Sequence, residues 1–492
     1  MLYNKIVKKV VISKLFLYRH RFVLGYILLA LLLATTIFLL PLISPNGLSE
    51  SEMQSAITSN NTTFQSILEG EVVDFPYHMM QHLSIQVLGL TTYAIKLPSI
   101  IIGAILAVLL ILLLNRWFKN NVALFSSIIT VLSPPFLYLA GTGTPLIMLV
   151  FWPVLLLWLG SKIQGVNKPN SVYCFIFAFV LLFAVLTPYL IYLAAFILLF
   201  VLLQPHLRHT IKTLPRIPFI LVTIIILAGL GAIAFSLSKN LPAITTLCFM
   251  SDFSPEHYLN NLTSAIPPLF SSNGNIESTF LAPIIGLPLL ALAFTGLIST
   301  TKGFFASRNS IASLLLVFTA LITGFEPTAA ILIIIPIAIL IAHGLRYILE
   351  HWYGLFPENP YARIFAIFPI TIVMGIMIFS DISHFVFGYR YNPSVAKQFN
   401  NDLALVHEHV PEGSTILVQP DSTEYSFYKI LESSPKNLKV TSVVPSAGEV
   451  SSLHKWQNSE NLAINRIITS PKSEDSDRIY VYTVKKQESK KE

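Results

Sequence analysis

Hydrophobic residues occur along this chain in long blocks separated by shorter polar stretches. A single membrane span needs about 17–25 mostly apolar residues. On that basis the pattern predicts about eleven apolar segments, several of them short, centred on 22–43, 97–115, 122–140, 146–160, 172–187, 189–204, 217–238, 283–299, 311–324, 328–345 and 364–386. We therefore expect a polytopic α-helical membrane protein.

The composition supports this expectation. Of the 492 residues, 54% are hydrophobic and only 12% are charged, which is typical of an integral membrane protein. The net charge of +7 is dispersed over short loops and forms no single basic face, so no nucleic-acid partner is expected. The first apolar run is too long for the core of a signal peptide, which favours an uncleaved first span over a removed leader.

Basic residues divide unequally between alternate loops. If the N-terminus is cytoplasmic, seventeen lysines and arginines fall inside and only Lys96 and Lys239 fall in outward loops before the C-terminal region. Cytoplasmic loops carry an excess of Lys and Arg, so this split predicts an N-terminus inside the cell and a C-terminus outside it, in a multi-pass protein of the cell membrane.

Two long polar stretches then lie on the outer face, a first outer loop at 44–96 and a second at 239–283. Long ordered loops are usually functional. Within the first loop, Ser49–Ser59 and Met79–Ala94 predict amphipathic helices lying in the membrane interface. We expect residues 1–388 to form the transmembrane domain and residues 389–492 to form a small soluble extracytoplasmic α/β domain.

In the C-terminal region the long apolar runs give way to short segments whose hydrophobic patterns are those of strands and helices in alternation. Strands are predicted at 414–419, 438–444, 464–469 and 479–484, and helices at 394–410, at 421–431 and near 449–456. The absence of a glycine-rich phosphate fingerprint gives no support for nucleotide binding.

The first outer loop holds the candidate catalytic acids, Glu50 and Glu52. A general base for a hydroxyl must lie within hydrogen-bond reach and have a pKa raised by partial desolvation. A glutamate on an interfacial helix can meet both conditions. The alternative is structural, because acids favour the first turn of a helix.

Lys96 is a candidate ligand for a phosphate. It lies just ahead of Leu97 and Pro98, and Pro98 suits the first turn of a helix. A lysine together with a helix N-terminus favours a phosphate at the level of the lipid headgroups. The alternative is a lysine that extends to ordinary lipid headgroups.

Other polar side chains of the same loop form a candidate substrate pocket, namely Asp74, Tyr77, His78 and Gln81. His78 and His82 share one helical face, so a divalent metal is conceivable. No third ligand is fixed, however, and metal sites usually need three or four. We therefore predict no metal ligands.

Several stretches resemble the GT-C superfamily of membrane glycosyltransferases, in particular the protein O-mannosyltransferase and lipid A aminoarabinose transferase group. The order and spacing of the motifs carry the resemblance: Leu48-Ser49-Glu50-Ser51-Glu52-Met53, Pro76-Tyr77-His78, Ala94-Ile95-Lys96-Leu97-Pro98-Ser99, Asn115-Arg116-Trp117-Phe118-Lys119 and Leu132-Ser133-Pro134-Pro135.

The resemblance implies a transferase that takes a sugar from a polyprenyl-phosphate donor on the outer face, with an acid of the first outer loop as base. The register places Ser51 at the family's aspartate and Glu52 at its glutamate, so the role of base falls to Glu50 or Glu52. The loop Gly141–Pro145 lacks the second aspartate expected from the family.

Three functions therefore remain open. The first is a hexosyl or pentosyl transferase, mannosyltransferase-like, that uses a polyprenyl-phosphate-linked sugar and an envelope lipid, glycan or protein as acceptor. The second is a non-catalytic protein of the same fold that binds a polyprenyl lipid or an envelope partner. The third, a secondary transporter, is disfavoured because the predicted spans carry almost no ionisable residues.

Overall fold

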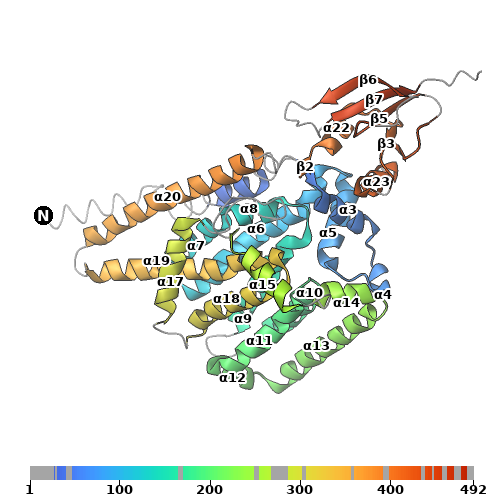
Figure 1. Cartoon of the computed structure of the whole chain (residues 1–492). Helices are drawn as coiled ribbons and strands as arrows, with labels where there is room; N and C mark the ends of the chain where they lie inside the picture. Colours follow the sequence, from blue (N-terminus) through green and yellow to red (C-terminus); the bar gives the residue numbers. More distant parts are fainter. Residues whose placement is uncertain are drawn as a thin grey trace, which may run out of the picture.

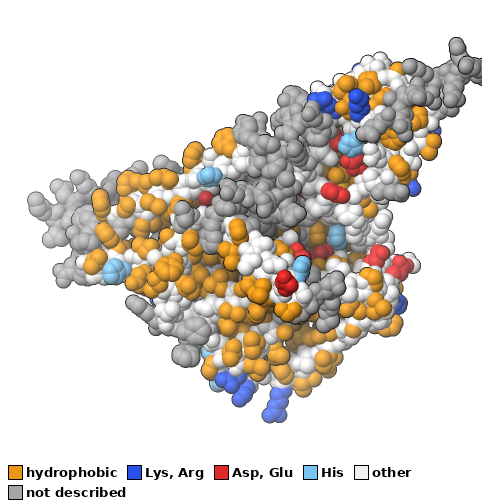
Figure 2. Space-filling view, in the orientation of Figure 1, with side chains coloured by type: hydrophobic (Ala, Val, Ile, Leu, Met, Phe, Trp, Pro, Cys, Tyr) orange, Lys and Arg blue, Asp and Glu red, His pale blue; other side chains and the backbone are white. Residues whose placement is uncertain are grey.

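Long helices make up most of the molecule, and a small β-sheet lies at one end of the helical bundle (Figure 1). The computed structural model describes residues 27, 30–39, 47–163, 170–248, 254–267, 286–301, 306–355, 360–391, 398–420, 422–433, 438–445, 448–456, 462–469 and 478–484. Hydrophobic side chains cover much of the bundle surface seen in Figure 2, as expected of a surface that faces lipid.

Six helical segments in the described part of the chain are long and apolar enough to cross a membrane, or eight if each of two bent pairs counts as one span. Each of the eleven predicted apolar segments overlaps a helix, but several of these helices are short, and the count of eleven spans stays a prediction. The helices of the bundle are Ala30–Leu39, α6 (Thr92–Trp117), α7 (Asn120–Val131), α8 (Pro134–Gly141), α9 (Met148–Ile163), α10 (Ser171–Val185), α11 (Ile191–Leu203), α12 (Pro205–Lys212), α13 (Arg216–Leu237), α14 (Leu241–Cys248), α15 (Pro255–Ser264), α17 (Leu287–Thr301), α18 (Ser307–Phe325), α19 (Ile334–Leu355) and α20 (Pro360–Tyr391), with 3₁₀ turns η1 (Pro145–Ile147) and η2 (Pro327–Ile333).

Prolines account for both bends. α7 and α8 meet at an angle of 62°, and Pro134 begins the second helix; α11 and α12 meet at 95°, where Pro205 begins the second. Proline has no N–H and clashes with the preceding turn, so it interrupts a helix but fits the first turn of the next one. The 95° bend sets α12 almost perpendicular to α11.

The first polar loop is folded into short elements rather than extended. It contains β1 (Leu48–Ser49), α3 (Glu50–Asn61), α4 (Ser66–Glu69) and α5 (Phe75–Leu88). Ser49 and Glu52 form a reciprocal capping box that fixes the start of α3. The helix predicted at Ser49–Ser59 is therefore present. The bounds predicted for the second helix, Met79–Ala94, are wrong, because α5 begins at Phe75 and ends at Leu88, and Ala94 belongs to α6.

The prediction that a helix starts at Pro98 is wrong. α6 begins at Thr92, capped by the Thr91 hydroxyl, and Pro98 lies inside it. A proline inside a helix leaves the carbonyl four residues earlier without its usual partner. Here the Ser84 hydroxyl of α5 donates to that carbonyl, Ala94 O, at 2.6 Å, which explains how α6 continues through Pro98.

The C-terminal region forms a mixed five-stranded sheet in the order β4-β3-β5-β7-β6. β3 pairs in parallel with β4 and β5, while β7 pairs antiparallel with β5 and β6. The strands and flanking helices are β2 (Phe399–Asn400), α22 (Asp402–His409), β3 (Thr415–Leu417), α23 (Thr423–Lys429), η3 (Ile430–Ser433), β4 (Lys439–Thr441), β5 (Glu449–Ser452), β6 (Leu462–Thr469) and β7 (Arg478–Val484).

The helix predicted near Glu449–Trp456 is wrong, because β5 is the central strand of this sheet. Pairing with β3 on one side and β7 on the other satisfies its backbone groups. The predicted helix at 394–410 is shorter in the structure, since α22 begins only at Asp402. The four predicted strands are confirmed with small shifts of their ends.

The polar loop and the C-terminal region share one hydrophobic core. Leu48, Met53 and Ile95 pack in the same buried cluster as Val406 and Phe427. The strand pair β1–β2 joins the two segments as well, with Leu48 opposite Asn400. The C-terminal sheet is therefore anchored on the first polar loop, above the larger membrane core.

Candidate active site

Glu52 lies at the third position of α3 and is completely buried, with 0% of its side chain exposed. Its Oε2 accepts from the Ser49 N–H at 2.8 Å and from the Ser49 hydroxyl at 3.3 Å. Its Oε1 accepts from the Gly143 N–H at 2.6 Å. Hydrogen bonds to backbone N–H groups stabilise a buried carboxylate.

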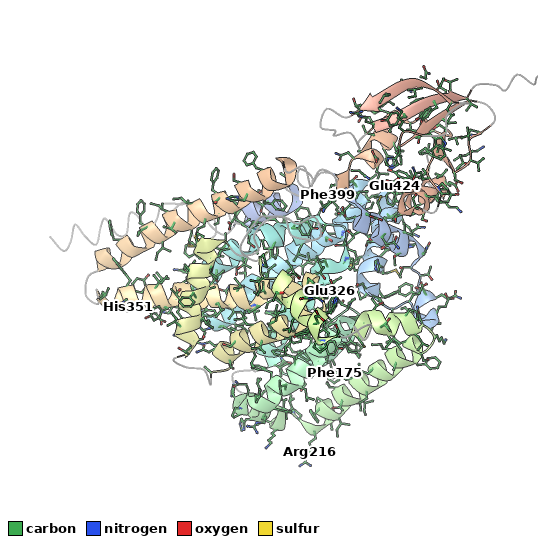
Figure 3. All side chains as sticks on the ribbon, in the orientation of Figure 1. Phe175, Arg216, Glu326, His351, Phe399 and Glu424 are labelled. Carbon is green, nitrogen blue, oxygen red and sulfur yellow. The ribbon has the colours of Figure 1, made fainter. Side chains whose placement is uncertain are left out.

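Lys96 supplies the countercharge. Its Nζ lies 3.7 Å from Glu52 Oε1, and the lysine is only 1% exposed. The Phe399 ring lies over the ammonium, with its centroid 5.9 Å from Nζ. Figure 3 shows Phe399 at the junction between the helical bundle and the C-terminal sheet. The pair therefore brings together α3, α6, the loop after α8 and β2.

Gln81 of α5 connects the same segments through its side-chain amide. Its Oε1 accepts from the hydroxyls of Ser55 at 2.9 Å and Ser59 at 2.6 Å. Its Nε2 donates to the carbonyls of Ile95 and Gly143, both at 2.9 Å. Gln81 is fully buried, so these four bonds satisfy the amide inside the protein.

Tyr77 and His78 are also buried beside this network. The Tyr77 hydroxyl lies 2.8 Å from the Ser99 hydroxyl, and His78 Nδ1 lies 2.8 Å from the Ser59 hydroxyl. Burial lowers the pKa of His78 to about 4 and raises the pKa of Tyr77. Both side chains are therefore neutral near pH 7.

Asp74, at the N-terminal boundary of α5, is a buried acid with unusual backbone geometry. Its φ of 49° lies in the left-handed region, which aspartate tolerates better than most residues. Burial raises its pKa to about 8, and a hydrogen bond with the Thr187 side chain opposes that shift. Thr187 in turn accepts from Trp152 Nε1 at 3.1 Å. At neutral pH Asp74 is therefore mostly protonated.

Glu50 lies apart from this buried network. It is exposed at the first position of α3, and its Oε1 accepts from the Thr423 hydroxyl of α23 at 3.1 Å. Residues two apart on a helix do not share a face. Glu50 therefore lies toward the C-terminal region, and Glu52 toward the membrane core.

Sequence reasoning missed two contributors, Gly143 and Phe399. The loop Gly141–Pro145 has no aspartate, and what it offers Glu52 is the backbone N–H of Gly143. A Cβ on Gly143 would lie 2.7 Å from Ile95 Cγ2, so the close approach requires glycine. Two features of the sequence could have pointed to this contact. One is the pair of glycines shortly before Pro145, and the other is the Ser-x-x-Glu spacing of the capping box, which fixes Glu52 at the start of a helix.

The remaining polar candidates give no second site. In the second outer loop, Glu256 and His257 lie on α15 and are both exposed, and Asp252 lies outside the described residues. Within the described ranges, no group of three or more His, Cys, Asp or Glu side chains could hold a metal ion. His82 Nδ1 lies 2.9 Å from Ser59 O instead.

Comparison with known proteins finds a family that is similar to part of the chain. Residues 76–233 match the PMT_2 family, described as dolichyl-phosphate-mannose-protein mannosyltransferase. No curated protein sequence matches the chain.

Solved structures share the fold over most of the chain. ArnT from Cupriavidus metallidurans bound to undecaprenyl phosphate aligns with a TM-score of 0.52 and 12% identity, over 94% of this chain and 98% of that one. The archaeal oligosaccharyltransferase AglB from Archaeoglobus fulgidus, in complex with an inhibitory peptide and a dolichol-phosphate, aligns with a TM-score of 0.51 and 14% identity. That alignment covers 85% of this chain and 61% of AglB.

The family match includes α5, Lys96 and the Gly143 loop, and the structural matches extend over the rest of the bundle. The resemblance that the sequence motifs indicated is therefore supported: residues 76–233 are similar to the mannosyltransferase family, and the chain shares its fold with the membrane proteins ArnT and AglB.

Proposed function

We propose that this protein is a glycosyltransferase that moves a hexosyl or pentosyl group from a polyprenyl-phosphate donor to an envelope lipid, glycan or protein. The observation that carries the proposal is the enclosed Glu52–Lys96 pair near the N-terminal end of α6. The fold shared with ArnT, solved with undecaprenyl phosphate, and with AglB, solved with dolichol-phosphate, supports the same lipid class.

In this reaction the acceptor hydroxyl oxygen attacks the anomeric carbon of the sugar. The bond between that carbon and the phosphate oxygen breaks, and the polyprenyl phosphate leaves with its negative charge. A carboxylate removes the proton of the acceptor hydroxyl. An ammonium group beside the leaving phosphate stabilises the charge that develops on it.

We assign the phosphate to Lys96. Its Nζ is covered by the Phe399 ring, so a donor phosphate reaches it once Phe399 moves aside. Among the described strands, the two-residue strand of Phe399 pairs with β1 alone, so hydrophobic packing of the buried ring contributes more to its position than backbone hydrogen bonds do. Asp74, Tyr77, His78 and Gln81, all buried at the start of α5 or within it, are the side chains that we assign to the substrate pocket.

Glu50 and Glu52 remain the two candidate bases, and their surroundings differ. Glu50 is exposed, so an acceptor that enters over the C-terminal region can reach it. Glu52 lies beside Lys96, but both its oxygens already accept hydrogen bonds. The proposal includes the predicted orientation, with the N-terminus inside and residues 389–492 outside, where they face the acceptor while packed on the first polar loop.

The second candidate function is binding of a polyprenyl lipid or an envelope partner without sugar transfer. The complete burial of Glu52 favours it, because a carboxylate with every oxygen engaged is poorly placed to accept a proton. The serine at position 51, where the family has an aspartate, also favours it.

In the test, the native host produces one of three single variants, Glu50→Gln, Glu52→Gln or Lys96→Gln, in place of the unmodified protein. Glu69→Gln, on the exposed side of α4, is the matched control. Envelope lipids, glycans and proteins are compared by mass spectrometry. Sugar transfer predicts loss of one product in Lys96→Gln and in one or both of Glu50→Gln and Glu52→Gln, with Glu69→Gln unchanged. If deletion of the whole chain removes no sugar-bearing product, the transferase proposal is wrong.

A further inference from the structure

A basic cavity lies at the end of α6 opposite Lys96. It has a volume of about 380 Å³ and is lined by four cations, Arg116, Lys119, Arg308 and Arg346, together with Glu350 and Tyr353. Glu350 pairs with Arg346 at 2.8 Å, so positive charge in the lining exceeds negative charge by three. Such an excess in a confined space favours an anion.

This cavity is separate from the candidate active site. Lys96 and Arg116 lie on the same helix, and twenty residues at 1.5 Å each place them about 30 Å apart, roughly the thickness of the hydrocarbon core. The distribution of basic residues predicts that this end of α6 is cytoplasmic. The cavity therefore cannot hold the same phosphate as Lys96.

An apolar cavity of about 330 Å³ adjoins the basic one and shares Trp117 and Arg308 with its lining. Arg308 donates from Nη1 to the Trp117 carbonyl at 3.0 Å, which holds the guanidinium at the boundary between the two spaces. The apolar cavity is lined by α9, α10, α11 and α13, with Phe196 and Phe200 among the side chains.

α12 also contributes side chains to the lining of this apolar cavity. Leu207 and Ile211, four residues apart on one face of α12, line the cavity. Arg208 and Lys212 are exposed, and Figure 2 shows a group of Lys and Arg side chains at the lower end of the molecule, where Figure 3 labels Arg216. A helix of this pattern, bent by 95° from its predecessor, suits a membrane interface.

We propose that these adjoining cavities bind a membrane phospholipid with an anionic headgroup. The basic cavity takes the phosphate, and the apolar cavity takes one acyl chain. A soluble phosphate compound would leave the apolar cavity unused, and a neutral lipid would leave the cations unmatched. Basic pockets between transmembrane helices on the cytoplasmic side are suited to anionic headgroups. This inference does not depend on the proposed glycosyl transfer.

The test compares the full-length protein with Lys119→Gln/Arg346→Gln, both in detergent, by native mass spectrometry with added phosphatidylglycerol or phosphatidylcholine. Arg308 is left intact because it also bonds to the Trp117 carbonyl. Each basic residue near a membrane surface contributes about 1 kcal/mol to anionic lipid binding, so the double variant is expected to bind phosphatidylglycerol roughly tenfold to thirtyfold more weakly.

The matched control is Lys212→Gln/Arg216→Gln, which removes two cations from the same end of the bundle but outside both cavity linings. It should retain phosphatidylglycerol like the unmodified protein. Equal weakening in the two double variants would overturn the proposal, as would equal binding of phosphatidylcholine and phosphatidylglycerol. Displacement of bound lipid by inorganic pyrophosphate at comparable concentration would instead assign the basic cavity to a soluble phosphate. A melting temperature within a few degrees of the unmodified protein ensures that each variant is folded.

Discussion

Glu52 of α3 and Lys96 of α6 form a salt bridge that solvent does not reach, with 3.7 Å between Oε1 and Nζ. Removing one partner from such a pair leaves an uncompensated buried charge, which is far more costly than removing both. The pair therefore stabilises the junction of the polar loop with the bundle, whatever its role in chemistry.

The first prediction concerns the coupling of these two residues. Glu52→Gln should lower the free energy of unfolding by about 3–5 kcal/mol, because Lys96 then remains buried without its carboxylate. Glu52→Gln/Lys96→Gln should lose less than the sum of the single variants, with a coupling of about 1–3 kcal/mol. Chemical denaturation in detergent measures these values. Glu69→Gln is the control, and strictly additive losses would contradict the finding.

The second prediction concerns Gln81, whose amide makes four hydrogen bonds to α3, α6 and the Gly143 loop. Gln81→Leu leaves buried hydroxyl and carbonyl groups without their hydrogen-bond partner. Each group that finds no other partner lowers the free energy of unfolding by about 1–3 kcal/mol. We expect a loss of about 3 kcal/mol in unfolding free energy. Gln86→Leu changes the same residue type on the exposed side of α5 and should have little effect; similar losses in both variants would argue against the network.

The third prediction tests the close approach of Gly143 to α6. In Gly143→Ala the new Cβ would lie 2.7 Å from Ile95 Cγ2 and 3.0 Å from Ile95 O, so the loop must shift away from Glu52. Overpacking of this kind costs about 1–3 kcal/mol. Gly231→Ala, where no atom lies within 4 Å of the new Cβ, is the control in α13. Thermal unfolding of both variants should show a lower melting temperature for Gly143→Ala alone.

The fourth prediction concerns pH. The folded protein raises the pKa of Asp74 to about 8 from an ordinary value of 3.8, so the folded state holds this proton more tightly than the unfolded state. The contribution of Asp74 to the free energy of unfolding is therefore fully present at pH below about 4, and it declines as the pH rises toward 8. Asp74→Asn keeps the shape, tolerates the left-handed backbone and should flatten this decline. Melting curves from pH 5 to 9 would contradict the assignment if both proteins lost stability in parallel.

The sequence predicted the arrangement of long elements well, because that information is local. A span needs only a sufficient run of apolar residues, and each of the eleven predicted segments overlaps a helix. The four strands predicted in the C-terminal region are present for the same reason, because the alternation of hydrophobic and polar residues that indicates a strand lies within a few neighbouring residues. The assignments of Glu50, Glu52 and Lys96 to chemistry stay predictions.

Errors arose where distant segments decide the local structure. Glu449–Ser452 is a strand because β3 and β7 supply its partners, which its own residues do not reveal. α6 continues through Pro98 because Ser84 of another helix bonds to the freed carbonyl of Ala94. In both cases a tertiary contact outweighs the local preference.

The sequence by itself determined that this is a membrane protein of apolar helices with an acid-rich polar loop and a small α/β region, since each of these follows from composition and short-range period. Only the tertiary structure decided that Glu52 is enclosed by Ser49, Gly143 and Lys96 while Glu50 faces Thr423. Two glutamates separated by one residue are equivalent in a sequence pattern. The helix rotates between these two positions, so one side chain lies in the buried network and the other at the surface. Which of the two is buried depends on the segments that pack against α3.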